Sequence, residues 1–165
     1  MTGRSPLVNR FDRLFTRLLR LGGRLAGRPD EEMLHELTGR SKGGAAGGTD
    51  SSAYLRHLEQ GRRDLQAGDF GEALHQFKRA SEARSQEPWP WHGRGDVLQL
   101  TGDHAAALVA YDEALARAPL ALAHNGRGNA LECLGRLEEA REAWRAALDL
   151  DPRLSWPRNS LERTE

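Results

Sequence analysis

Three histidines are the residues whose chemistry would matter most if the fold brought them together. His57, His92 and His124 recur at near-equivalent places in three similar segments of the chain, and imidazole is a common ligand of zinc. If each lies on its own helix, neighbouring helices pack ~10 Å apart. That separation is too large for one zinc ion with bonds of ~2 Å. The sequence therefore predicts no metal site and no cofactor.

The other candidates for chemistry are equally isolated. Cys133 is the single cysteine, has no obvious base partner, and is interpreted as a small packed residue. It allows no internal disulfide, which is typical of a reducing compartment and favours a cytoplasmic location. The acids between Arg136 and Arg141 suit i,i+3 and i,i+4 ion pairs on a solvated helix. No strand is predicted, so no glycine-rich phosphate loop follows one, and the chain is predicted not to be an enzyme.

Composition and charge exclude two further classes of protein. The 165 residues are 38% hydrophobic and 29% charged, with a formal net charge of zero. Residues 51–165 carry 15 basic and 18 acidic residues, which argues against a nucleic-acid partner. No stretch approaches the ~20 apolar residues of a membrane span. Lysine occurs only at Lys42 and Lys78, a bias we interpret as that of a high-GC bacterial genome.

One pattern occurs three times and accounts for most of the chain. It consists of a glycine, a second glycine, an alanine, an aromatic residue and a final alanine, always at the same offsets. The copies are Gly61, Gly68, Ala73, Phe77 and Ala80; then Gly95, Gly102, Ala107, Tyr111 and Ala114; then Gly128, Gly135, Ala140, Trp144 and Ala147. A repeat period of this size is typical of a stacked helical array.

Each copy predicts two antiparallel helices. Gly68, Gly102 and Gly135 would end the first helix in a left-handed conformation. Asp69 and Asp103 follow, where a carboxylate can cap the next helix. The glycines within the first helix would allow a close crossing, with an alanine of the second helix opposite and the aromatic residue filling the core.

These residues resemble the tetratricopeptide repeat (TPR) family over roughly residues 51–152. In "WHGRGDVLQLTGDHAAALVAYDEALARAP", the first tryptophan (Trp91) and the closing Pro119 match the family signature, and Pro152 closes the third copy. His57 and His124 replace the signature tryptophan, and Ser85 replaces a closing proline. The resemblance implies an all-α, right-handed solenoid of helical hairpins that binds other proteins.

The chain divides into three predicted parts. Residues 1–38 would hold a basic amphipathic helix and a short second helix, and residues 39–50 a glycine-rich flexible linker. Residues 51–165 would form the repeat domain. Its predicted segments are repeats at 54–87, 88–120 and 121–153, then a capping helix at 154–163. Trp156 and Leu161 would pack against the last repeat, with Pro157 in the first turn of the cap.

The N-terminal segment presents an apolar stripe opposite an arginine stripe. The apolar residues include Phe11, Leu14, Phe15 and Leu18; the arginines include Arg10, Arg13 and Arg17. Three interpretations stay open. Residues 7–25 would lie on an anionic membrane surface, dock into a groove of a partner or of the protein's own repeats, or form a cleaved transit peptide.

The family resemblance also implies a binding surface along the first helix of each repeat. The candidate residues are Arg62, Trp89, His92, Asp96, Gln99, Asn125, Asn129 and Glu132. The subfamily that clamps a chaperone carboxylate needs Lys and Asn where this chain has Leu58 and Asp96. Asn125 and Asn129 are expected to bind an extended peptide backbone, and Trp89 to act as an aromatic anchor.

The sequence therefore predicts a non-enzymatic adaptor, scaffold or assembly factor that binds a protein or peptide. Its tethered N-terminal helix would add a second contact and raise avidity. Two alternatives remain open: a peripheral membrane tether whose basic helix binds anionic lipid, and a self-assembling repeat protein.

Overall fold

A computed structural model describes residues 48–164 of the chain, with side chains from residue 51 onward. This part contains α-helices and no strand. The helices are α3 (Gly48–Ala67), α4 (Phe70–Ala83), α5 (Trp89–Thr101), α6 (His104–Leu115), α7 (Ala121–Cys133), α8 (Leu137–Leu150) and α9 (Ser155–Thr164). The predicted amphipathic helix at 7–25, the short second helix and residues 39–47 of the linker lie outside the described residues. Helix α3 begins at Gly48, inside the segment predicted as linker.

Each of the first three hairpins turns on a glycine, as predicted. Gly68, Gly102 and Gly135 have φ values of 86°, 86° and 78°, in the left-handed region that side chains with a Cβ seldom adopt. After α5, the N–H of Gly102 donates to the Gln99 carbonyl at 3.2 Å, and the N–H of Asp103 donates to the Leu98 carbonyl at 2.9 Å. The same pair of bonds ends α3 and α7. All three hairpins therefore use a Schellman motif to satisfy the last carbonyls of the first helix.

The capping prediction holds at one of two positions. The Asp103 carboxylate accepts a hydrogen bond from the N–H of Ala106 at 3.1 Å and caps α6. Asp69 occupies the same position before α4, but its side chain makes no capping hydrogen bond. The two aspartates have nearly the same backbone angles, so the difference lies in where the Asp69 side chain points.

The core consists of aromatic rings set between glycines. A Cβ on Gly95 or on Gly126 would lie 2.5 Å from the Tyr111 ring, so neither position accommodates a side chain. The predicted close approach of the two helices is therefore confirmed. The prediction of which residues lie opposite the glycines is wrong. The glycines of the first helices face aromatic rings, whereas the prediction placed alanines opposite them. The alanines Ala73, Ala107 and Ala140 are fully buried, and their small size lets the paired helices approach.

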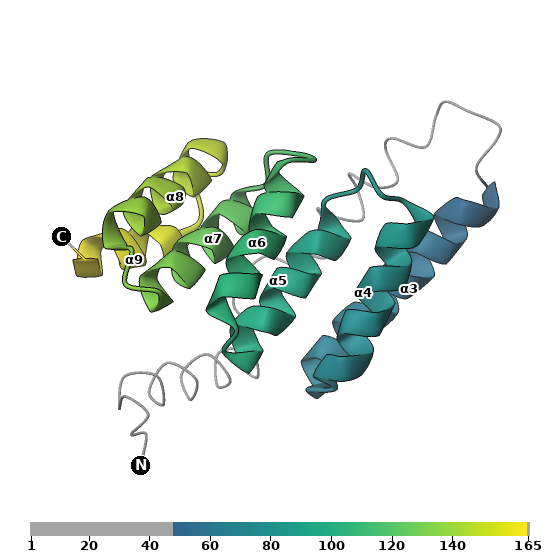
Figure 1. Cartoon of the computed structure of the whole chain (residues 1–165). Coiled ribbons are helices and arrows are strands. Elements are labelled where there is room, and N and C mark those ends of the chain that lie inside the picture. The colour runs from purple at the N-terminus through teal and green to yellow at the C-terminus, as the bar shows by residue number, and fades with distance from the viewer. Residues whose placement is uncertain (1–47, 165) are drawn as a thin grey trace, which may run out of the picture. The chain divides into compact units, whose positions relative to one another are not determined.

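Successive helices pack in chain order, as Figure 1 shows from α3 to α9. Helix α7 also contacts α5 and α9, so the first helices of successive repeats lie next to one another. Helix α9 covers the last repeat, and Leu161 packs against the core around Trp144. Pro157 is fully buried in the first turn of α9. Trp156 is 44% exposed, so Pro157 is the more deeply buried of the two. The described residues form an all-α repeat solenoid with a cap.

Candidate functional site

The candidate surface is the row of side chains along α3, α5 and α7 that the sequence predicted, from Arg62 to Glu132; we call it the predicted groove. Because α5 and α7 are in contact, their side chains can act together. The amide of Gln99 on α5 donates to the sulfur of Cys133 on α7 at 3.5 Å. Cys133 is exposed, so its interpretation as a packed residue is wrong. It lies at the last residue of α7, where the chain turns outward.

Three polar side chains form a network in the second repeat. The Tyr111 hydroxyl donates to Asp96 Oδ1 at 2.8 Å, and His92 Nδ1 lies 3.2 Å from Asp96 Oδ2. The His92 ring meets the rings of Trp89 and Tyr111 edge to face, with centroids 6.0 Å and 5.8 Å away. The helix spacing brings Trp89, His92 and Asp96 onto one face of α5. The predicted aromatic anchor is therefore a half-buried ring held by His92.

Burial and neighbouring charge act in opposite directions on this network. Desolvation raises the pKa of Asp96 above its usual value, while His92 and the Tyr111 hydrogen bond lower it. Burial, and then the Asp96 carboxylate, raise the pKa of Tyr111 well above its usual value, so the phenol stays a donor. The Asp96 side chain remains 35% exposed. A ligand can therefore reach a carboxylate that is already ordered by its neighbours.

The third repeat has an equivalent contact with different chemistry. The Trp144 indole N–H donates to Asn129 Oδ1 at 3.1 Å, and Trp144 is fully buried. Asn129 was predicted to bind a peptide backbone together with Asn125. Its carbonyl oxygen instead satisfies the core tryptophan, so it supports the fold as well as lining the predicted groove. Asn125, one turn earlier, makes no such contact with the core.

Glu132 lies on the predicted groove and also forms an ion pair with the capping helix α9. Its carboxylate pairs with the Arg163 guanidinium of α9 through contacts of 2.8 Å and 3.1 Å. Only 14% of the Glu132 side chain is exposed, so a partner has limited access to it. The sequence did not predict this pair, because the residues are far apart in the chain and on different helices.

Two amide oxygens on the predicted groove accept no hydrogen bond within the described residues. They are Gln99 Oε1 on α5 and Asn125 Oδ1 on α7, and both atoms are buried. A buried acceptor without a donor costs free energy, and such atoms in folded proteins commonly indicate a missing partner. These two oxygens lie on neighbouring helices and are the chemically unsatisfied part of the predicted groove.

The first repeat has an arginine at the equivalent position of the predicted groove. Arg62, the equivalent of Asp96 and Asn129, is half-buried on α3. Its partner aromatic is Phe77, which has no polar atom and so requires no acceptor. A Cβ on Gly61 would lie 2.9 Å from that ring. The residue type that follows the helix glycine therefore varies with the aromatic residue of the same repeat.

Sequence reasoning missed two glycines and one arginine. Gly93 and Gly126 each face the aromatic ring of the preceding repeat, Phe77 and Tyr111, with a Cβ predicted 2.5 Å from ring carbons. The signal was present, because these glycines share the repeat period. Arg117 stacks over Trp91 at 4.1 Å and donates to the Ser85 carbonyl at 2.7 Å. It holds the turn that lacks the closing proline of the first repeat.

The histidines have three different surroundings. His57 Nδ1 lies 2.8 Å from Gln76 Oε1, His92 pairs with Asp96, and burial next to Arg127 lowers the pKa of His124. Among residues 51–164, no three His, Cys, Asp or Glu side chains lie close enough to hold a metal. No helix within that range is long and apolar enough to cross a bilayer.

Comparison with known proteins identifies the repeats. Tetratricopeptide repeat models match residues 58–108 and 121–154. A search of curated proteins finds no match.

Solved structures with the same fold include several TPR domains. The first TPR domain of Spaghetti (RPAP3) bound to an HSP90 peptide is 24% identical, with a TM-score of 0.66, over 68% of this chain and 90% of that one. The Arabidopsis OM64 TPR domain is 20% identical, with a TM-score of 0.67, over 70% and 97%. The second TPR domain of human RPAP3, in complex with an HSP70 peptide, is 18% identical, with a TM-score of 0.65, over 70% and 97%. With two family matches across the repeats and this fold, the chain belongs to the tetratricopeptide repeat family.

Proposed function

We propose that this protein is an adaptor that binds an extended segment of a partner protein along the predicted groove. The observation that carries the proposal is the pair of buried amide oxygens, Gln99 Oε1 and Asn125 Oδ1, that accept no hydrogen bond within the described residues. Because both oxygens are buried, the two amides would rotate toward the surface to accept hydrogen bonds from backbone N–H groups of an extended peptide. Solved TPR neighbours are bound to peptides, which supports the same class of function for this chain.

The partner segment is expected to differ from the peptides of those neighbours. The peptides in those complexes, SRMEEVD and SGPTIEEVD, both end in the acidic sequence EEVD. In this chain, the predicted groove places the Asp96 carboxylate beside Trp89 and His92, and Leu58 is buried. An acidic peptide end would lie next to like charge at Asp96. A neutral or basic segment with an aromatic contact to Trp89 suits the surface better.

The test is peptide selection followed by calorimetry on the full-length protein. A displayed random-peptide library is panned against the chain, and selected peptides are titrated into wild type, Asn125→Ala and Asn159→Ala. Asn159 is exposed on α9, so its replacement removes the same group from outside the predicted groove. We expect Asn125→Ala to weaken binding about tenfold, as the loss of one buried hydrogen bond does, and Asn159→Ala to bind as wild type. Equal affinity of all three proteins would remove the groove proposal.

The arginine-rich N-terminal segment supports a second role, that of a peripheral membrane tether. Its apolar and arginine stripes at residues 7–25 have the pattern of a helix that lies on anionic lipid. Flotation with vesicles of phosphatidylserine and phosphatidylcholine would test this. Wild type is expected to float at low salt, and Phe11→Asp, Leu18→Asp and a chain without residues 1–38 are expected to stay at the bottom. Equal recovery of all of them would exclude lipid binding by this segment.

A further inference from the structure

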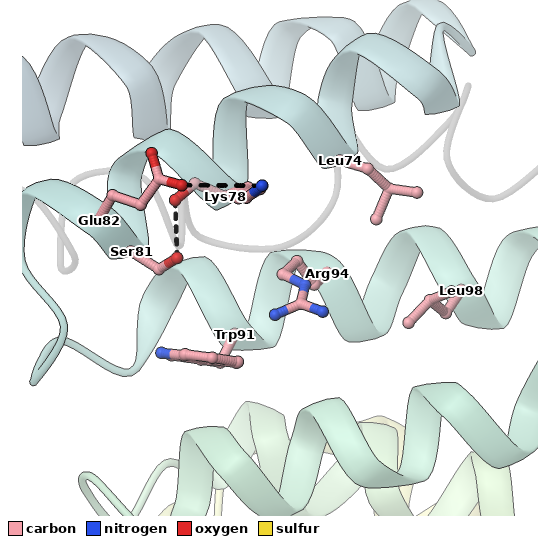
Figure 2. Close-up of a pocket in the computed structure, with 7 residues that line it drawn as sticks. All are labelled: Leu74, Lys78, Ser81, Glu82, Trp91, Arg94 and Leu98. Atoms are coloured by element: carbon pink, nitrogen blue, oxygen red, sulfur yellow. Dashed lines mark hydrogen bonds and ion pairs between the residues drawn. The ribbon is translucent and has the colours of Figure 1, made fainter.

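The seam between α4 and α5 contains a pocket that the predicted groove does not include. Its volume is about 430 Å³. Figure 2 shows the residues that line it: Leu74, Lys78 and Glu82 come from α4, and Trp91, Arg94 and Leu98 come from α5. At 3.6 residues per turn, the residues that α5 contributes to the pocket lie roughly 150° around the helix from Trp89, His92 and Asp96. The pocket is therefore on a different face of the solenoid.

The same seam recurs between α6 and α7, where an ion pair joins the two helices. Arg127 Nε donates to Asp112 Oδ1 at 2.7 Å. By the repeat period, Arg127 is equivalent to Arg94 and Asp112 is equivalent to Lys78. Between α4 and α5, Lys78 therefore stands where Asp112 pairs with Arg127 between α6 and α7. Two cations therefore stand where the repeat geometry elsewhere places a cation and an anion.

The charges around the pocket leave Arg94 without an anion. Its guanidinium stacks on the Trp91 ring at 4.8 Å and, within the described residues, makes no ion pair. The one acid that lines the pocket, Glu82, is 3.8 Å from Lys78. In addition, the Trp91 indole N–H is buried and donates no hydrogen bond within the described part of the chain. The pocket thus combines a net positive charge with two leucines.

We propose that this pocket docks an acidic and aliphatic segment of a partner protein. A Glu or Asp carboxylate of the partner would occupy the place that Asp112 takes in the second seam and would pair with Arg94 and Lys78. An adjacent aliphatic side chain would pack between Leu74 and Leu98. The site is independent of the predicted groove and gives the protein a second interaction surface, which would raise avidity for a partner that engages both.

The test uses the indole resonances of the four tryptophans in the full-length chain. The probe is the blocked peptide acetyl-Leu-Glu-Leu-amide, titrated in a ¹H–¹⁵N NMR experiment, with acetyl-Leu-Gln-Leu-amide as its uncharged match. We expect the Trp91 indole N–H to shift with the acidic peptide, and the Trp89 and Trp144 indoles to stay in place. Equal responses to the two peptides, or no response at Trp91, would overturn the proposal. A Trp91 shift with inorganic phosphate as large as with the peptide would also overturn it, because the site would then bind a free anion.

Two charge reversals at equivalent positions provide the matched variants. Lys78→Asp rebuilds the ion pair of the second seam with Arg94, and it is expected to weaken the peptide response at least tenfold while the protein stays folded. Arg145→Asp makes the same kind of change at the equivalent exposed position of α8, away from the pocket, and it is expected to leave the response unchanged. Thermal unfolding verifies that both variants fold. Equal responses of both variants and wild type would show that Lys78 and the pocket take no part. Asn125→Ala should not alter this response, so the two proposals fail separately.

Discussion

The second and third repeats satisfy the same buried aromatic position with different acceptors. In the second, the Tyr111 hydroxyl donates to the Asp96 carboxylate at 2.8 Å. In the third, the Trp144 indole N–H donates to the Asn129 amide at 3.1 Å. The acceptor in each case directly follows a glycine that faces the ring. The residue at this position of the predicted groove must therefore supply an acceptor for the polar hydrogen of the buried aromatic side chain.

The comparison separates residues that shape the groove from residues that are available to a partner. Asn129 is used by the core, and Glu132 is used by the cap through Arg163. Asp96 is ordered by Tyr111 and His92 but stays partly exposed. Asn125 and Gln99 retain unpaired acceptors within the described residues. The unsatisfied acceptors of the predicted groove therefore lie on α5 and α7.

The largest expected effect comes from filling the space beneath an aromatic ring. In Gly128→Ala, the new Cβ would lie 2.4 Å from Trp144 Nε1, so it would push the buried ring away and disturb its bond to Asn129. We expect a loss of about 3 kcal/mol in the free energy of unfolding, measured with denaturant. Gly71→Ala is the control: nothing lies within 4 Å of its Cβ, and it should stabilise α4 by up to about 1 kcal/mol. A Gly128→Ala protein as stable as wild type would contradict the packing described here.

An intermediate effect is expected from removing the acceptor of the third repeat. Asn129→Ala leaves a buried indole N–H unpaired and should cost about 1–3 kcal/mol. Asn129→Asp keeps an acceptor and should recover part of that loss, which would make the third repeat resemble the second. Asn125→Ala, one turn away, should change stability by less than about 0.5 kcal/mol. Equal losses at Asn125 and Asn129 would mean that the Trp144 hydrogen bond does not contribute.

The smallest expected effect is a pH dependence carried by Asp96. Its pKa is raised in the folded protein, with desolvation as the largest cause, so the folded state binds the proton more tightly than the unfolded state. This contribution is fully present below the unfolded pKa of about 3.9 and is lost as the pH rises through the folded pKa.

Asp96→Asn should therefore reduce the pH dependence of the free energy of unfolding in that acidic range. It should also raise the free energy of unfolding at pH 7. Because the Asp96 side chain is 35% exposed, solvent screening keeps the gain small. Denaturant melts of both proteins from pH 4 to pH 7 would measure it. A difference between the two proteins that does not change with pH would contradict the assignment to Asp96.

Local turn chemistry and repeat spacing were sufficient to predict the hairpins. Gly68, Gly102 and Gly135 were expected in the left-handed region because only glycine adopts it without strain, and all three do. Gly61, Gly95 and Gly128 were expected at a close crossing, which the structure confirms. Their partner was misassigned because the pattern shows that two helices meet but does not show which side chain fills the contact.

Contacts between distant residues were not predictable in the same way. Asn129 was placed on the groove from its register alone, and nothing in the sequence around it indicates that Trp144 needs its oxygen. The Glu132–Arg163 pair joins α7 to the cap, and the Arg117–Trp91 stack joins the two ends of the second repeat, so neither is visible in the local sequence. A comparison of the second and third copies could have found Gly93 and Gly126, which occupy equivalent positions. A comparison of the first and second copies could also have found the substitution of Lys78 for the aspartate of the next copy.

The packing of the Phe77 and Tyr111 rings affects which ligands the repeats could bind. Each ring rests on a glycine of its own repeat and on a glycine of the next one. One aromatic ring therefore lies between each of these glycines and the glycine of the next first helix. A ligand that runs across α3, α5 and α7 meets contact points at a fixed pitch, and a segment with mismatched spacing cannot be accommodated by sliding the helices apart. The spacing of the first helices would therefore select ligands whose contact residues have a matching spacing.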